Sequence, residues 1–295
     1  MTRLNKRFSV LKFFLLGIIL VSFGFRLFEN KPLIVENNKA ALTYHLKGGE
    51  LKDFHLKPNG LNPFSVLQGE LGNAYLSINA VPDSNMVVWD LVNSPILKNK
   101  TMEFMMKADF LKDKITVKRQ VRLESGKTGF HVKESFFNYD VAEKAIKPSQ
   151  HISLNPELLN NAMIYSNVEL ALPKNIASKK PRAFDKIKDE SSLHWIVIAN
   201  ADKNLLLGYV WTGNDYSKVI IENSANGAFL SLMEKDEEQK PLESKGERSK
   251  SYFCFLQEIS DGFKKVSTIH PVKGRIILET SDQKQRFDLG KTLEM

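Results

Sequence analysis

Arg119 and Glu134 are the two charged residues whose spacing says most about this chain. Alternate residues around them are mainly apolar over 115–123 and 130–138, which is the pattern of one face of a β-strand. The segment 124–129, Glu-Ser-Gly-Lys-Thr-Gly, predicts a hairpin turn between the two strands. Folding symmetrically about this turn places Arg119 opposite Glu134 on an otherwise apolar face. The pair either cross-links two strands or presents the guanidinium to a ligand hydroxyl or carboxylate.

Several familiar catalytic motifs are absent from the sequence. There is no Gly-x-Gly-x-x-Gly, no Walker loop, no His-Glu-x-x-His, no Gly-x-Ser-x-Gly and no cysteine cluster. Nucleotide, zinc-protease and serine-hydrolase functions therefore have no support, and we predict neither a metal site nor a cofactor. The single cysteine, Cys254, lies between Phe253 and Phe255 in a strand-like run, which predicts core packing and excludes an intramolecular disulfide.

The charge distribution argues against a nucleic-acid partner. The 295 residues carry a formal net charge of +8, with 26% charged and 42% hydrophobic residues. Four positive charges, Arg3, Lys6, Arg7 and Lys12, precede residue 25 without any acidic residue. In the remainder Lys and Glu are interspersed, and no basic stripe with interleaved aromatic residues appears.

The N-terminal residues 1–25 resemble an export signal. The basic start is followed by an uncharged apolar run over 13–25. A run of this length fits a signal peptide better than a spanning helix, which needs about 20 residues. We expect an exported, periplasmic or cell-envelope protein, with 1–25 either cleaved as a signal peptide or retained as a membrane anchor. This segment is the only membrane contact that we expect.

The rest of the chain predicts one all-β domain over 32–295. Short strand-like runs separated by turn residues dominate it, and the segment 156–160 predicts one helical turn. Polar stretches at 174–190 and 234–250 predict solvated loops. The strand-like runs are 41–46, 50–56, 74–79, 86–91, 101–110, 115–123, 130–139, 168–172, 195–200, 205–211, 218–222, 228–233, 251–257, 266–269 and 275–280.

Three segments resemble the aldose 1-epimerase (galactose mutarotase)-like superfamily. Segment 49–64 is similar to its opening hairpin, in which a Gly precedes a strand, a polar turn follows, and an Asn comes before the next element. Segment 130–138, followed by His151, resembles a strand that ends in Asn and a loop that leads to a His at the head of the next strand. Segment 227–234, followed by Lys-Gly-Glu within 242–247, resembles the strand that bears the family's carboxylate and the turn after it.

This resemblance implies a large antiparallel β-sandwich, or supersandwich, that binds a carbohydrate in a cleft. The family's chemistry opens a cyclic sugar, so that an acid protonates the ring oxygen while a base takes the proton of the anomeric hydroxyl. Carrying these roles over gives His151 as the acid and Glu234 as the base, without metal or nucleotide. The sequence departs from the family where an earlier His is expected, because the region 64–85 contains none.

Further sugar contacts are expected from the segment 211–216, Trp-Thr-Gly-Asn-Asp-Tyr, which follows an apolar strand-like run. Trp211 and Tyr216 are expected to stack on the apolar face of a sugar while Asp215 binds hydroxyls. The alternative is that both rings pack at the edge of the core. Arg119 is the fourth predicted substrate-binding residue.

Two other functions stay open on the sequence alone. A non-catalytic glycan-binding or envelope-assembly module of the same fold would explain the missing histidine. A protein-interaction domain at the membrane surface would use the basic segment 179–182, Lys-Lys-Pro-Arg, against anionic lipid.

Overall fold

The structure is a computed structural model. The predicted signal or anchor at 1–25 and the basic segment 179–182 lie outside the described residues. Within the described part of the chain, no helix is both long enough and apolar enough to cross a membrane. The structure describes residues 32–58, 74–78, 87–111, 113–168, 170–171, 183–188, 192–213, 215–224, 227–234, 241–260, 262–281 and 286–291.

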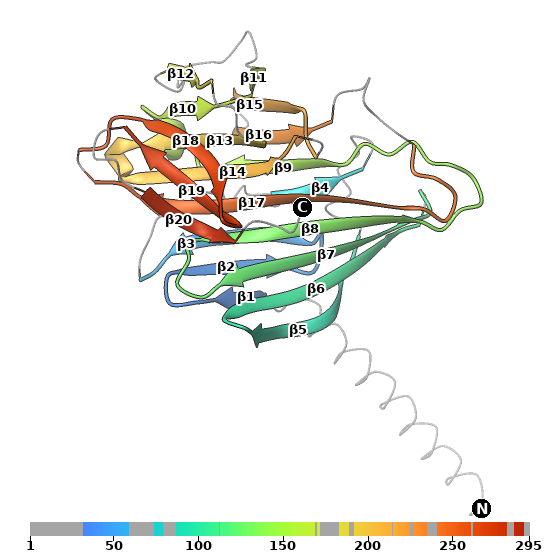
Figure 1. Ribbon diagram of the computed structural model, residues 1–295. Coiled ribbons are helices and arrows are strands. Elements are labelled where there is room, and N and C mark those ends of the chain that lie inside the picture. The colour runs from blue at the N-terminus through green and yellow to red at the C-terminus, as the bar shows by residue number, and fades with distance from the viewer. Residues whose placement is uncertain are drawn as a thin grey trace, which may run out of the picture.

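The described strands form three sheets, which Figure 1 shows. The eight-stranded sheet has the order β1 (Leu33–Glu36), β2 (Ala40–His45), β3 (Glu50–Leu56), β4 (Ala74–Ser77), β9 (Ser149–Leu154), β16 (Gly227–Met233), β15 (Lys218–Ser224) and β11 (Leu170–Ala171). The nine-stranded sheet has the order β12 (Ala183–Lys186), β10 (Met163–Ser166), β13 (Leu193–Asn200), β14 (Leu205–Thr212), β17 (Glu247–Glu258), β8 (Gly129–Asn138), β7 (Ile115–Glu124), β6 (Thr101–Phe110) and β5 (Asp90–Lys98). The third sheet contains β18 (Val266–Val272), β19 (Arg275–Thr280) and β20 (Arg286–Lys291).

The predicted all-β sandwich is confirmed, and its sheets are antiparallel except at two edges. Strand β12 pairs parallel with β10, and β11 pairs parallel with β15. The predicted helical turn is α2 (Pro156–Leu159), where the Asn155 side chain caps the helix by accepting a hydrogen bond from the Glu157 amide. A short 3-10 helix, η1 (Ala201–Lys203), precedes β14.

The hairpin of β7 and β8 has the predicted register. Leu123 lies opposite Phe130, and Arg119 lies opposite Glu134. Their ion pair measures 2.7 Å, and the two side chains are 3% and 1% exposed. The guanidinium also donates to the carbonyl of Gly49, in the turn before β3 of the other sheet. The pair is therefore buried between the two large sheets and connects them.

Two apolar cores explain why the middle strands of the nine-stranded sheet are hydrophobic on both faces. One core lies between the two large sheets and receives Leu205, Leu207 and Tyr209 of β14. The other receives Leu206 and Val210 of the same strand, which pack beneath the three-stranded sheet. Successive residues of a strand point to opposite faces, so a strand covered on both sides loses the polar alternation. The third sheet thus accounts for the continuous apolar run 205–211.

The buried ion pair gives a testable stability prediction. Arg119→Met should lower the free energy of unfolding by about 3–5 kcal/mol, because it leaves the Glu134 carboxylate buried without its partner. The double variant Arg119→Met/Glu134→Leu should recover much of that loss, because both charges are removed. Urea unfolding followed by circular dichroism measures both values.

The exposed neighbour Lys133 supplies the control for this cycle. Lys133→Ala should change stability by less than about 0.5 kcal/mol. A double variant that is as unstable as Arg119→Met would show that the lost packing, and not the unpaired charge, dominates.

Candidate functional site

His151 lies at the centre of the eight-stranded sheet, on the face that points away from the other large sheet. On β9 its neighbours Gln150 and Ile152 point inward, as the alternation of a strand requires. The outward imidazole lies between two hydroxyl groups. Its Nε2 is 2.8 Å from the Oγ of Ser77 on β4, and its Nδ1 is 3.1 Å from the Oγ of Ser231 on β16. Three neighbouring strands therefore supply one hydroxyl–imidazole–hydroxyl array.

The array is polar but uncharged near neutral pH. Burial lowers the pKa of His151 below its ordinary value of 6.5, so the ring is neutral at pH 7. A neutral imidazole donates at one nitrogen and accepts at the other, and each serine hydroxyl can take either role. His151 and Ser231 stay partly exposed, while Ser77 is buried. The array can thus offer hydrogen bonds of both kinds to a hydroxylated ligand.

Two further side chains share this outward face. Phe229 lies two residues before Ser231 on β16 and is partly exposed, while Leu230 between them points into the core. Glu222 on β15 lies directly opposite Phe229 and is exposed. The outward face therefore carries an aromatic ring and a carboxylate beside the His151 array.

Glu234 lies on the other face of the same sheet. It is three residues beyond Ser231, so its side chain points inward, where it reaches β17 of the nine-stranded sheet. One carboxylate oxygen lies 2.5 Å from the ammonium of Lys250, and the other lies 3.7 Å from the guanidinium of Arg248. The structure does not bring His151 and Glu234 together, which corrects the predicted acid–base pair: the outward and inward phases of the strands separate them.

The three residues that the sequence predicted to contact a sugar at the end of β14 are buried. Trp211 is 2% and Tyr216 1% exposed, and the Trp211 indole donates a 2.7 Å hydrogen bond to the Tyr216 carbonyl. Asp215 is also buried, accepts hydrogen bonds from Thr212 and Ser251, and has its pKa raised by burial. The turn folds back against the sandwich and does not project from it. The alternative that both rings pack in the core therefore fits the structure, and sugar stacking by them does not.

Lys250 connects this buried turn to Glu234. Its ammonium donates to the Asp215 carbonyl, pairs with Glu234 and lies 4.7 Å from the centre of the Tyr216 ring. Burial lowers the pKa of Lys250, while the neighbouring carboxylate of Glu234 opposes that shift. The ion pairs of Glu234 with Lys250 and Arg248 join the two large sheets, which is the arrangement of a structural cross-link. Among the described residues, the Oε2 of Glu234 and the hydroxyl of Tyr216 have no hydrogen-bond partner.

Arg119 is likewise occupied within the core. Its contacts are Glu134, the Gly49 carbonyl and the Trp89 ring, whose centre lies 4.5 Å from the guanidinium carbon. Glu134 in turn accepts a 2.6 Å hydrogen bond from Gln150 of β9. The structure thus gives Arg119 the cross-linking role and not the ligand-binding one that the sequence left open.

Sequence reasoning missed Ser77, Ser231, Phe229 and Glu222. Each is an unremarkable outward residue of its own strand, and their proximity follows from the pairing of β4, β9, β16 and β15, which are distant in sequence. The alternation of Phe229, Leu230 and Ser231 indicates which of them face outward, but it does not indicate which strand lies beside them. Among the residues that the structure describes, no group of three or more His, Cys, Asp or Glu side chains could hold a metal ion.

Comparison with known proteins identifies the fold. No family model matches the sequence, and no curated protein matches it. A galactose mutarotase-like protein from Clostridium acetobutylicum shares the fold with a TM-score of 0.57 at 12% identity, over 78% of this chain and 96% of that one. A galactose mutarotase related enzyme from Lactobacillus acidophilus gives 0.56 at 11% identity, over 80% and 100% of the two chains. The chain therefore has the galactose mutarotase-like fold that the sequence segments predicted.

Proposed function

We propose that this protein binds a carbohydrate on the outward face of its eight-stranded sheet, around His151. The observation that carries the proposal is the array of Ser77, His151 and Ser231, which places donors and acceptors side by side on a partly exposed face. The fold supports it, because the similar structures are of galactose mutarotase-like proteins. We commit to binding, and not to anomer interconversion, as the function that this geometry favours.

The sugar ring would lie over Phe229. Two strand spacings and a two-residue offset separate the Cα atoms of His151 and Glu222 by ~12 Å. Both side chains can bridge this distance through one sugar ring, whose apolar face would rest on Phe229 between them. Hydroxyls on one side of the ring would bind the array, and a hydroxyl on the other side would donate to Glu222.

The position of Glu234 favours binding over catalysis. Anomer interconversion needs an acid and a base that reach the same sugar. Glu234 lies on the inward face and is paired with Lys250, so it is not available to a sugar bound at His151. Glu222 is the described carboxylate that shares the outward face near the array, and it would have to be the base if the protein were an enzyme.

The first prediction concerns affinity. A panel of neutral mono- and disaccharides should yield a ligand, and both His151→Ala and Phe229→Ala should weaken its binding at least tenfold, or about 1.4 kcal/mol. Isothermal titration calorimetry measures the change. Lys133→Ala is the control, and it should leave affinity within twofold of the wild type because Lys133 is exposed on β8 of the other large sheet. Full affinity in His151→Ala, with unchanged folding, would contradict the site.

A second prediction concerns pH. The folded pKa of His151 is lowered, so the ring stays neutral from pH 8 down to its unperturbed value near 6.5. Sugar affinity should be constant over that range and fall only at lower pH, where protonation removes the acceptor nitrogen and imposes a charge. Titrations between pH 4.5 and 8 test this. A decline centred above pH 7, or a decline that persists in His151→Ala, would assign the dependence to another group.

A third prediction separates binding from catalysis. NMR exchange measurements of α- and β-anomers should show no acceleration by the wild type beyond that of His151→Ala. Acceleration that Glu222→Gln abolishes and Glu234→Gln preserves would instead establish an epimerase whose base is Glu222.

A further inference from the structure

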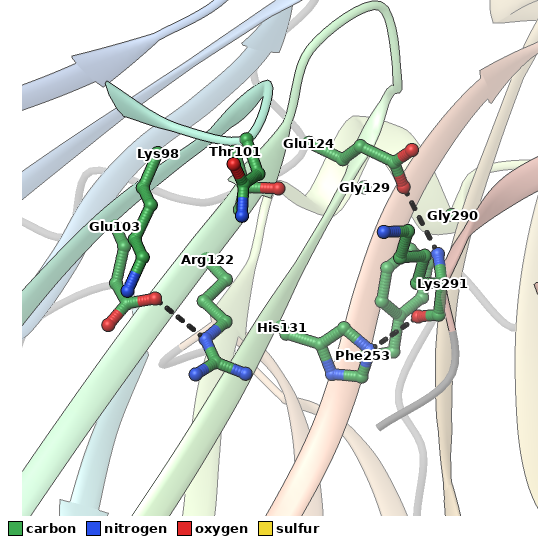
Figure 2. A pocket seen from close by; sticks show the side chains of 11 residues that line it. Lys98, Thr101, Glu103, Arg122, Glu124, Gly129, His131, Phe253, Gly290 and Lys291 are labelled. Carbon is green, nitrogen blue, oxygen red and sulfur yellow. Dashed lines mark hydrogen bonds and ion pairs between the residues drawn. The ribbon is translucent and has the colours of Figure 1, made fainter. Parts of the chain in front are cut away.

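A pocket of about 330 Å³ opens on the other side of the molecule, on the outward face of the nine-stranded sheet. Figure 2 shows that Lys98, Glu103 and Arg122 gather at one side of it and His131, Phe253 and Lys291 at the other. The two large sheets separate this pocket from the His151 array. None of the six residues predicted as catalytic or substrate-binding lines it.

The floor of the pocket is one row of side chains across four paired strands. Glu103 on β6 lies opposite Arg122 on β7, Arg122 opposite His131 on β8, and His131 opposite Phe253 on β17. Directly opposed side chains have Cβ atoms about 5 Å apart, so the row presents a carboxylate, a guanidinium, an imidazole and a phenyl ring in sequence. The turn between β5 and β6 and the end of β20 form the two walls.

Gly129 keeps the end of this floor open. A Cβ at this position would lie 2.4 Å from the Phe253 ring, so any larger residue would displace that ring. The Phe253 ring also meets the His131 ring edge-on, at 4.9 Å between centres. The aromatic part of the floor is therefore fixed by packing on its sheet side.

The carboxylates of the pocket are already satisfied by the protein. Glu103 accepts hydrogen bonds from Gln120 at 2.6 Å and from the Nε of Arg122 at 2.9 Å. Glu124 lies 3.3 Å from the guanidinium of Arg275 and accepts from the backbone amide of Lys291 at 3.2 Å.

The cations of the pocket are not satisfied in the same way. Among the described residues, the terminal amino groups of Arg122 have no hydrogen-bond partner, and the ammonium of Lys98 has no ion pair. The charge of Arg122 is already paired with Glu103 through Nε, so of these two cations the one without an ion pair in the described part of the chain is Lys98, while the terminal amino groups of Arg122 remain as hydrogen-bond donors. An anion suits both groups.

The His131 ring has a nitrogen that needs a hydrogen-bond donor. Its Nε2 lies 2.8 Å from the carbonyl of Lys291, so this nitrogen carries the proton and donates it. The Nδ1 is then an acceptor, and it is buried with no hydrogen-bond partner in the part of the chain that the structure describes. Burial lowers the pKa of His131 to about 4, which keeps this nitrogen unprotonated at neutral pH. A hydroxyl group next to the anionic group of a ligand would satisfy it.

We propose that this pocket binds a small hydroxylated carboxylate, such as an aldonic or uronic acid. Its carboxylate pairs with the terminal amino groups of Arg122, an adjacent hydroxyl donates to the Nδ1 of His131, and its carbon skeleton lies against Phe253. The cavity volume is at the lower end of the range for small-molecule sites, which fits a single sugar acid. This site goes beyond the proposed sugar-binding face and does not depend on it.

Calorimetric titration of the full chain with glucuronate, glucose and inorganic phosphate tests the proposal. Glucuronate should bind, and Arg122→Met should weaken it at least tenfold, while Arg122→Lys should retain part of the affinity because it keeps the charge without the bidentate geometry. The matched control is Lys118→Met, on the same strand and face but outside the pocket, which should leave binding within twofold. Equal loss in Lys118→Met, or binding of phosphate as tight as that of glucuronate, would overturn the hydroxy-acid assignment in favour of general charge attraction.

A second measurement is independent of any folding defect. The ¹⁵N resonance of His131 Nδ1 should shift on addition of glucuronate as that nitrogen accepts a hydrogen bond, and glucose at the same concentration should leave it unchanged. The same shift should occur in His151→Ala, which separates this site from the proposed sugar-binding face. An unchanged Nδ1 resonance at saturating glucuronate would place the acid elsewhere and refute the site.

Discussion

The hydrogen-bonded cluster of Arg119, Glu134 and Gln150 is the interaction on which the placement of the candidate site depends. Arg119 and Glu134 belong to the nine-stranded sheet, and Gln150 belongs to β9 of the eight-stranded sheet. A buried carboxylate requires its partners, so Gln150 must point inward to reach Glu134. The next residue, His151, must then point outward. If the pairing of β9 slipped by one residue, the His151 imidazole would be buried and the Glu134 carboxylate would lose its hydrogen bond from Gln150.

The same constraint operates at the end of β16. Glu234 is drawn inward by the buried ammonium of Lys250, and this phase turns Ser231 and Phe229 outward toward His151. Two polar interactions between the sheets thus set the phase of the two strands that build the outward face. They also explain why His151 and Glu234, which the sequence predicted to be an acid–base pair, lie on different faces of one sheet. The inward charged residues Arg119, Glu134 and Glu234 cross-link the sheets, whereas the outward Glu222 is exposed and can contact a ligand.

The sequence was most informative where the interacting residues are close along the chain. The hairpin of β7 and β8 could be predicted with its register, because one short turn and two alternating runs determine which residues meet. The setting of His151 could not be predicted, because β4, β9 and β16 are joined by long connections and strand order is not encoded locally.

The segment after β14 shows a second limit of the sequence. Trp211 and Tyr216 flank the turn residues that follow an apolar strand, which is also the pattern of an exposed rim. Only the hydrogen bond that folds the turn inward, from the Trp211 indole to the Tyr216 carbonyl, distinguishes the two cases. Strand β5 lies at Asp90–Lys98, further along the chain than the predicted run 86–91, because Pro95 and scattered polar residues conceal an edge strand.

The three-stranded sheet at the C-terminal end has a consequence for biosynthesis. It covers Leu206, Val210 and Phe255, which form an apolar surface on strands made earlier. A ribosome exposes those strands before residues 266–291 have emerged, so the nascent chain carries an uncovered hydrophobic surface until those residues are made. Termination of translation before residue 266 would yield a chain that keeps both large sheets but exposes this apolar surface, which would make it a substrate for chaperones and proteases.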